Sequence, residues 1–464
     1  MPKHALDKET TEFVILTFEG PDSYSLAGGL GVRTSHLCRT LATRGFRTHL
    51  FFVGDPHLPG EECAHSDRLV LHRWCQWIST YFPDGVYHGE EDKLRDYTRS
   101  VPGFVTDHIV RPAVAQGKAV VVLAEEWQTA EAMCRLGEQL RSDSLREHVL
   151  MFWNANNTYS FDRIDWARLN REIRITTVSR YMKDAMKGAG VNPLVIPNGI
   201  PDSLLHHVDT RKVRRVQQAL RGDPLLCKVA RGDPEKGWLE AVAATARLRG
   251  TTQRALLLAR GGIEPYGAEV MRKAVSTGLA VRPALPDSGS HNGHPAALQR
   301  AVPSDIIDIR FHLPQQFLRL LCRAADAVLA NSSHEPFGLV GLEAMAAGGI
   351  VFAGGTGEDY AVPFVNSFVL ETGDPEEIVT YITYLKRHPE EEARMRRAAR
   401  QWARYFTWNA AVDNLIAKAE NQARLQGILQ RDERLGHLHA TAPAPDNGSK
   451  MSWPSVRQPV YALA

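Results

Sequence analysis

The stretch that decides the fold is Ala330-Asn-Ser-Ser-His-Glu-Pro-Phe-Gly-Leu-Val-Gly-Leu-Glu-Ala-Met-Ala-Ala-Gly348. Residues 325–330 form a short apolar run, typical of a strand inside a sheet. Residues 339–347 are apolar and rich in alanine, and they predict a buried helix. The turn between strand and helix contains Pro336 and Gly338. Such a turn directs free backbone N–H groups, and the positive end of the helix dipole, at whatever lies in front of it, which suits a phosphate.

Two glutamates flank this helix start, Glu335 in the turn and Glu343 inside the helix. Carboxylates suit sugar hydroxyls, so the stretch predicts a pocket for a nucleotide-sugar. It resembles the E-x7-E signature of retaining glycosyltransferases of the GT-B fold, family 4 (glycosyl transferases group 1), which are related to glycogen and starch synthases. The resemblance implies that Glu335 holds hydroxyls of the donor sugar and Glu343 holds the ribose. The expected donor contacts at the helix start are Phe337, Gly338, Leu339 and Val340. The alternative is that the two glutamates only complement the helix dipole.

A second strand–loop–helix unit begins at residues 225–230 and continues into Arg231-Gly-Asp-Pro-Glu-Lys-Gly237. Arginine offers a fork for two phosphate oxygens and lysine a point charge, so the loop can clamp a pyrophosphate. It resembles the Arg-x-x-x-x-Lys-Gly loop of family 4. The resemblance implies that Arg231 and Lys236, together with Glu335, are the catalytic residues, and that the two cations neutralise the leaving nucleoside diphosphate. The alternative is surface ion pairing.

The first half of the chain opens with an apolar strand over 12–18 and a glycine loop, followed by a helix expected from about 35 to 44. Glycine lets the backbone approach an oxyanion closely. The loop lacks the G-x-G-x-x-G dinucleotide pattern. It resembles the Gly-Gly-Leu loop that faces the donor pyrophosphate in the family, which implies donor contacts at Gly28, Gly29, Leu30 and Gly31.

The expected acceptor side departs from that of the glycogen synthases. After a strand over 118–124, Glu125-Glu126-Trp127-Gln-Thr-Ala resembles their His-Asp-Trp-Gln-Thr-Ala element, but a glutamate replaces the histidine. Residues 152–157 also lack the histidine found in the relatives. We therefore predict a rebuilt acceptor face. Its candidate residues are Glu125, Glu126, Trp127, Asn154, Asn156 and Asn157. The alternative for the polar members is that they are turn residues and helix caps.

These units predict an α/β protein of GT-B fold, with two Rossmann-like doubly wound domains facing a central cleft. We expect an acceptor-binding domain over 1–200 and a nucleotide-sugar-binding domain over 201–405. A terminal helix over 406–430 is expected to pack back on the first domain, and a mobile tail to cover 431–464. The boundary lies at Pro197-Asn-Gly-Ile-Pro201, which interrupts regular structure.

Composition restricts the partners. The net charge of +2 gives no reason to expect a nucleic acid, and no apolar run is long enough to span a membrane. A weak peripheral membrane contact is one interpretation of the basic cluster Arg211, Lys212, Arg214 and Arg215; a solvated helix face is the other. The N-terminus lacks a signal-peptide pattern and the six cysteines are scattered, so we expect a cytoplasmic protein with reduced thiols.

No metal or other cofactor is expected. The chain contains no Asp-x-Asp, and His291 and His294 have no third ligand spaced nearby. The cationic loop and the helix start can neutralise the leaving group instead. The resemblance implies transfer of a hexosyl unit, with retention, from a UDP-, ADP- or GDP-sugar to a hydroxyl of a sugar or glycan. The alternatives are a disaccharide or glycan synthase or phosphorylase of the same fold, or an inactive nucleotide-sugar sensor.

Overall fold

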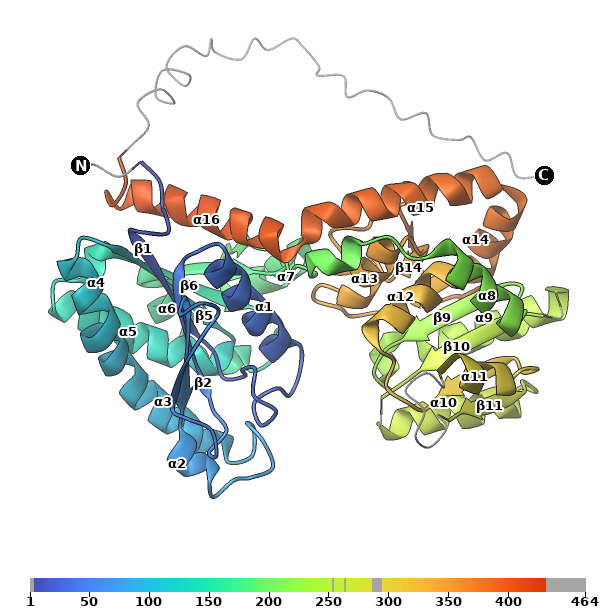
Figure 1. Cartoon of the computed structure of the whole chain (residues 1–464), viewed down its shortest axis with the longest axis horizontal. Helices are drawn as coiled ribbons and strands as arrows, with labels where there is room; N and C mark the ends of the chain where they lie inside the picture. The colour runs from blue at the N-terminus through green and yellow to red at the C-terminus, as the bar shows by residue number, and fades with distance from the viewer. Residues whose placement is uncertain (1–3, 253, 263, 286–293, 431–464) are drawn as a thin grey trace, which may run out of the picture.

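The computed structural model describes residues 4–252, 254–262, 264–285 and 294–430. In Figure 1 the chain forms two α/β units side by side, with α15 and α16 running along the top of both. Each unit contains one sheet with helices on both faces. This is the predicted architecture of two Rossmann-like domains. The tail predicted over 431–464 and His291 lie outside the described residues.

The first sheet has eight strands in the order β3-β4-β2-β1-β5-β6-β7-β8. All its neighbouring strands are parallel except the β3–β4 pair. β5 is a run of valine, leucine and alanine that ends in Glu125 and is buried along its whole length, as expected for a parallel strand covered on both faces. The strands are β1 (Thr11–Leu16), β2 (Arg47–Val53), β3 (Glu61–Ala64), β4 (Leu69–Trp74), β5 (Ala119–Glu125), β6 (Val149–Ala155), β7 (Arg174–Thr177) and β8 (Leu194–Val195).

The α-helices described before residue 200 accompany this sheet. They are α1 (Gly29–Thr43), α2 (Gln76–Ser79), α3 (Glu90–Val105), α4 (Arg111–Ala115), α5 (Ala130–Ser142), α6 (Trp166–Glu172) and α7 (Arg180–Ala185). The start of α1 differs from the expected position near residue 35. The helix begins at Gly29, directly after the extended residue Gly28. The glycines therefore form the first turn of the helix, and the loop before it is shorter than predicted.

The second sheet has seven strands in the order β11-β12-β10-β9-β13-β14-β15, and all its neighbouring strands are parallel. The strands are β9 (Leu225–Val229), β10 (Leu256–Arg260), β11 (Val281–Ala284), β12 (Ile306–Ile309), β13 (Ala327–Ala330), β14 (Val351–Ala353) and β15 (Phe368–Val369). The helices that follow residue 200 are α8 (Thr210–Leu220), α9 (Trp238–Thr252), α10 (Pro265–Ser276), α11 (His294–Arg300), α12 (Gln315–Ala324), α13 (Leu339–Ala347), α14 (Pro375–Arg387), α15 (Pro389–Ala403) and α16 (Trp408–Leu425).

The chain passes between the two units twice, and the two passages are hydrogen-bonded to each other. The N–H of Ile200 donates to the carbonyl of Phe406 over 2.9 Å, and the N–H of Trp408 donates to the carbonyl of Ile200 over 3.0 Å. Beyond this point α16 packs against α1, and Trp408 and Val412 join the buried cluster that contains Phe13. The last helix therefore belongs to the core of the first unit.

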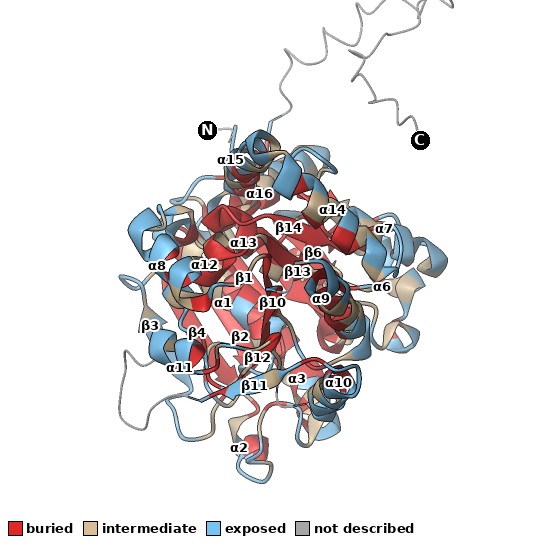
Figure 2. Cartoon of the chain, turned by 90° about the vertical axis from the view of Figure 1, so that its right-hand side faces the viewer, coloured by how far each residue is buried: buried red, intermediate tan, exposed pale blue. Residues whose placement is uncertain are grey.

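Figure 2 shows that burial is concentrated in the two sheets and in the helix faces against them, whereas the outer helix faces are exposed. One buried apolar cluster runs from strands of the first sheet to strands of the second and includes Ile200 and Leu204 between them. Ile200 and Leu204 are thus part of a core that is shared by the two units.

Candidate functional site

The site is built around the start of α13. β13 ends at Ala330, and the turn that follows leads to Gly338, which precedes the helix with φ 74°. That backbone conformation favours glycine. A Cβ on Gly338 would also lie 2.8 Å from Cγ of Glu358 and 3.0 Å from the hydroxyl of Tyr360. The helix predicted over 339–347 is present with those bounds.

The turn brings Glu335 and Lys236 together. Lys236 Nζ lies 2.7 Å from Glu335 Oε2, and both side chains are largely but not fully buried. The N–H of Glu335 donates to Thr356 Oγ1 over 3.1 Å, which fixes the turn from the β14 side. Arg231 is exposed in the loop that carries Lys236. A cation and a carboxylate from separate stretches, Lys236 and Glu335, thus meet in front of one helix start.

A buried lysine is hydrogen-bonded to residues where β13 passes into this turn. Lys228, on β9, donates to Asn331 Oδ1 over 2.6 Å and to the carbonyl of Leu329 over 3.3 Å. Asn331 in turn donates to the carbonyl of Gly237 over 3.1 Å. Burial lowers the pKa of Lys228 to about 7. Lys228 therefore joins the cationic loop to the turn before α13.

Two carboxyl groups near the turn, those of Glu343 and Glu358, have free acceptor positions; Oε2 of Glu358 accepts the N–H of Thr356 over 2.9 Å. Burial raises the pKa of Glu343 to about 7, and the described residues provide no hydrogen-bond donor to its side chain. Burial also raises the pKa of Glu358 to about 7, and its Oε1 is buried without a hydrogen-bond partner among those residues. Both can accept hydroxyl groups of a ligand.

Not every expected donor contact at the helix start can be a side-chain contact. Phe337 is 3% exposed and lies against Tyr360 and Phe406, with ring centroids 5.9 and 6.3 Å away. Its aromatic ring belongs to the core, so only its backbone can meet a ligand. Leu339 and Val340 are half-buried in the first turn of α13.

A side chain of the protein itself binds the glycine loop of the first unit, which corrects the expectation that the whole loop contacts the donor. Oε2 of Glu19 accepts the N–H groups of Gly28 and Gly31, each over 2.9 Å. The hydroxyl of Tyr87 donates to the other carboxylate oxygen over 2.6 Å. Gly29 and Leu30 lie in the same first turn, whose N–H groups have no partner inside the helix. Only this part of the loop is left for a phosphate while Glu19 stays in place.

Glu125 and Asn154 are not available to an acceptor sugar, which corrects two expected contacts. Glu125 is fully buried and pairs with Arg33, whose Nε lies 3.1 Å from each carboxylate oxygen. Glu125 also accepts from the side chains of Asn154 and Asn156, over 2.9 and 2.8 Å. A terminal nitrogen of Arg33 also donates to the side-chain oxygen of Asn198, which lies in the first passage between the units. Both carboxylate oxygens of Glu125 are engaged inside the protein, so this network holds the edge of the sheet to that passage.

Glu126 is the nearby carboxyl with a shifted pKa. Burial raises its pKa to about 7, although the N–H of Asn156 and the side chain of Asn157 donate to it over 2.6 and 3.1 Å. Asn157 also accepts the N–H of Tyr159 over 2.7 Å, as a turn residue does. Asn156 and Asn157 are half-buried. These contacts favour the turn interpretation for Asn157.

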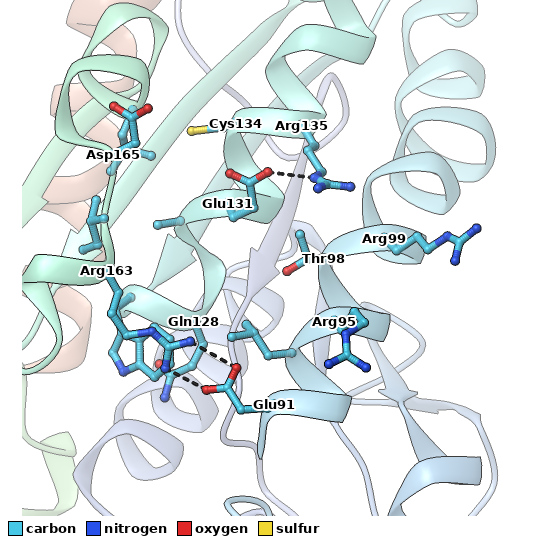
Figure 3. Close-up of a pocket in the computed structure, with 15 residues that line it drawn as sticks. Glu91, Arg95, Thr98, Arg99, Gln128, Glu131, Cys134, Arg135, Arg163 and Asp165 are labelled. Atoms are coloured by element: carbon cyan, nitrogen blue, oxygen red, sulfur yellow. Dashed lines mark hydrogen bonds and ion pairs between the residues drawn. The ribbon is translucent and has the colours of Figure 1, made fainter. Parts of the chain in front are cut away.

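A hollow of about 530 Å³ lies between α3, α5 and the segment before α6 (Figure 3), and Trp127 is one of its lining residues. The Arg163 guanidinium covers the indole at 4.0 Å from the ring centroid and pairs with Glu91 at 2.8 Å. Arg135 in the same hollow pairs with Glu131 at 2.8 Å. Neither the expected donor residues nor the other acceptor candidates line this hollow. The hollow therefore does not bring Trp127 together with them.

The first unit contacts the turn before α13 directly. The hydroxyl of Tyr181, on α7, lies 2.6 Å from Nδ1 of His334, the residue before Glu335. The N–H of Arg180 donates to Asp359 over 2.9 Å. In the described part of the chain, no hydrogen bond or ion pair joins Gly28–Gly31 to the second unit. The two predicted halves of the donor site are therefore placed on facing units without touching.

Within the described residues, no three His, Cys, Asp or Glu side chains form a group able to hold a metal ion. None of the described helices is long and apolar enough to cross a membrane. The basic residues expected as a membrane contact lie on α8, which buries Val213, Val216 and Leu220 and exposes Arg211.

Three site residues were not anticipated from the sequence: Glu19, Lys228 and Glu358. A charged residue inside an apolar strand run was a signal for Lys228, since lysine is rarely buried without partners. Glu19 follows the first strand and Glu358 follows a glycine-rich loop, which are positions where ligand contacts are common in α/β folds. Neither position predicts the hydrogen-bond partner.

Comparison with known proteins gives a family match over part of the second unit and a match of the overall fold. Residues 299–402, which include α13, match the model of the family described as glycosyl transferases group 1. The chain is 33% identical over 222 residues to the D-inositol 3-phosphate glycosyltransferase of Thermomonospora curvata, a match that covers 43% of this chain and 52% of that protein. The chain thus spans about half the length of this curated relative.

Two solved structures match nearly the whole fold. Sucrose-phosphate synthase from Thermosynechococcus elongatus has a TM-score of 0.62 at 19% identity, covering 89% of this chain and 98% of its own. Anabaena HepE in complex with UDP has a TM-score of 0.56 at 16% identity, covering 88% and 100%. The fold is therefore the GT-B fold of two Rossmann-like units, as predicted.

Proposed function

We propose that this chain, which carries a glycosyl transferases group 1 domain on a GT-B fold, transfers a hexosyl unit from a nucleoside-diphosphate sugar to a hydroxyl of a sugar or glycan. The observation that carries the proposal is the contact of Lys236 with Glu335 at the start of α13. A diphosphate that displaces this contact finds Lys236, Arg231 and the α13 amides on one side, while Glu335 becomes free for sugar hydroxyls.

The leaving group needs charge neutralisation as the bond to the sugar breaks. In the proposed route the two cations and the helix start provide it, and the chain needs no metal. Glu343 accepts the ribose hydroxyls, for which an unpaired, half-buried carboxyl is suited. The configuration is retained by attack on the donor face from which the diphosphate leaves. A diphosphate oxygen accepts the acceptor proton, so the route uses no side-chain nucleophile.

The first unit supplies the acceptor side in this proposal. Among the candidates there, Glu126 has a raised pKa and Asn156 is half-buried. We assign these two residues to the acceptor side. The contact of Tyr181 with His334 makes the position of the acceptor face sensitive to the turn that carries Glu335. Closure over the donor would exclude water and limit its hydrolysis. A cytoplasmic location, and weak membrane contact through α8, remain part of the proposal.

The test is a donor screen with the full-length protein. UDP-, ADP-, GDP- and CDP-sugars are incubated with and without EDTA, and released nucleoside diphosphate and thermal stabilisation are both recorded. Release from one donor, unaffected by EDTA, is the expected result. Stabilisation by a donor with no release, even with a broad acceptor panel, would favour a nucleotide-sugar sensor. Formation of a sugar 1-phosphate and a free sugar from a disaccharide and inorganic phosphate, with no nucleoside diphosphate released from any donor, would favour a phosphorylase. No stabilisation by any donor would refute the donor site.

A further inference from the structure

A second hollow lies in the second unit, and none of the proposed donor residues lines it. It has a volume of about 380 Å³ and is bounded by α12, α15, the end of α13 and the segment that leads into α8. Its lining includes four arginines, Arg323, Arg396, Arg397 and Arg400, and a single carboxylate, Glu392. Pockets of about 300–1,000 Å³ are typical of small-molecule sites.

The charge of this hollow is not balanced by its own residues. Arg396 is the satisfied member: it pairs with Glu392 at 2.8 Å and donates to the carbonyls of Gly348 and Ala325 over 3.1 and 2.8 Å. Glu392 is thereby engaged. Among the described residues, no acceptor or ion-pair partner is present for the Arg323 or Arg397 side chain. Two guanidinium groups at the hollow are therefore available to a ligand.

The guanidinium of Arg400 is a third group at the hollow, and its hydrogen-bonding capacity is only partly used. One of its terminal nitrogens donates to the carbonyl of Leu205 over 2.7 Å, whereas its Nε is buried and has no partner in the described part of the chain. Burial, and then the neighbouring Arg396 and Arg400, lower the pKa of Arg323. The carboxylate of Glu392 acts in the opposite direction on Arg323, but it is one counterion among four guanidinium groups. The folded protein thus holds an excess of like charge in this hollow, a cost expected where a site is built for an anion.

The contrast with the hollow of Figure 3 supports this interpretation. That hollow also contains four arginines, but three acidic side chains lie among them, and two of its arginines are paired within it. In the hollow between α12 and α15, by contrast, one carboxylate lies among four arginines, and its ion pair is with Arg396.

We propose that the hollow between α12 and α15 binds a small phosphate monoester with a hydroxylated body, such as a sugar phosphate. Planar guanidinium forks recognise phosphate oxygens in pairs, which assigns the phosphate to Arg323, Arg397 and Arg400. The remaining polar groups of the lining, His207 and Thr210, are suited to hydroxyls. The volume exceeds the need of a phosphate alone and accommodates the sugar.

The position of the hollow connects it with the reaction site. His207 and Thr210 follow the first passage between the units, and α15 leads directly into the second passage at Thr407. Ala347 and Gly348, also in the lining, end the helix whose start carries the donor residues. A ligand that joins these elements therefore acts on both passages and on α13, so we expect it to change donor turnover without contacting the donor.

The test uses the full-length protein and calorimetric titration with a hexose 6-phosphate, with inorganic phosphate, and with sulfate at the same ionic strength. We expect saturable binding of the hexose 6-phosphate that is at least 10-fold tighter than that of sulfate. R323A and R397A should each weaken it by roughly 10-fold or more, as expected for loss of a charge-assisted contact. R272A, which removes an exposed arginine of α10, is the matched control and should leave it unchanged.

A stability measurement separates a binding role from a structural one. R323A relieves repulsion among the arginines, so the ligand-free variant should melt roughly 1–3 °C above the parent protein. A lower melting temperature, or binding equally strong in all three variants, would overturn the proposal. Inorganic phosphate binding as tightly as the ester would remove the sugar from it. UDP titration of the same variants reports on the donor site independently and should not change.

Discussion

Replacing Lys228 by methionine should abolish one component of the pH dependence of stability. Lys228 is 1% exposed, and burial lowers its pKa from 10.5 to about 7. At ~1.4 kcal/mol per pKa unit, keeping this lysine charged in the folded protein costs roughly 5 kcal/mol. The methionine variant escapes that cost, but it leaves the acceptors on Leu329 and Asn331 without their donor, a loss of roughly 1–3 kcal/mol for each. At pH 6 the two effects nearly cancel.

The sign follows from proton uptake on unfolding. Between pH 7 and 10.5 Lys228 is neutral in the folded protein and protonated in the unfolded chain, so unfolding binds a proton and stability rises with pH. The slope is ~1.4 kcal/mol per pH unit for one such group. Below pH 7 the group is protonated in both states and contributes no slope. The parent protein should therefore gain roughly 2–3 kcal/mol relative to K228M between pH 7 and pH 9.

Urea unfolding at pH 6, 7, 8 and 9, followed by circular dichroism, measures this difference. Other titrating groups are common to both proteins and cancel. K273M, which replaces an exposed lysine of α10, is the matched control and should follow the parent protein at every pH. Parallel curves for the parent protein and K228M would refute the argument, because they would mean that Lys228 keeps its proton in the fold. K228M should also bind nucleoside diphosphate more weakly, since Lys228 orders Asn331 under the loop of Lys236.

Three further predictions concern carboxylates. E125A should cost about 3–5 kcal/mol in urea unfolding, because it leaves Arg33 buried and unpaired, and a double R33M/E125M variant should recover most of the loss; additive losses would contradict a buried ion pair. E19A should cost about 2–4 kcal/mol by the same measurement, because two α1 amides lose a charged acceptor, and a change below about 0.5 kcal/mol would mean that these contacts are absent in solution. Binding of nucleoside diphosphate should strengthen from pH 6 to pH 8 as Glu343, with its pKa of about 7, becomes a carboxylate acceptor, and E343Q should be weaker and flat over that range; an equally pH-dependent E343Q would assign the titration elsewhere.

The local structure of the site in the second unit could be predicted from the sequence. Residues 330–348 predicted a strand, a turn and a helix, and the helix has the predicted bounds. The reason is that Pro336 and Gly338 mark the turn, while residues 339–347 are apolar, rich in alanine and free of proline, so these signals indicate the same local structure. The cationic loop was likewise predicted, and its lysine reaches Glu335, 99 residues away in the chain.

The first unit was harder to predict, because tertiary contacts decide what its polar residues do. Glu125 and Asn154 had the composition of a sugar site, yet Arg33 and Asn198 engage this network from other elements. The glycine loop suggested free amides, but Glu19 folds back on them. A pattern of residue types shows which groups are near the sheet edge. It does not show which of them satisfy one another.

The most direct test of the account is a comparison of turnover with nucleoside diphosphate affinity in R231A and K236A, using the donor identified by the screen. Both residues are assigned to the leaving diphosphate, whose charge grows in the transition state, so single-turnover donor cleavage should fall roughly 10²–10³-fold. The dissociation constant of the nucleoside should change far less. K273M serves as the control here as well. Equal losses of turnover and of nucleoside binding would contradict the assignment of Arg231 and Lys236 to the leaving group.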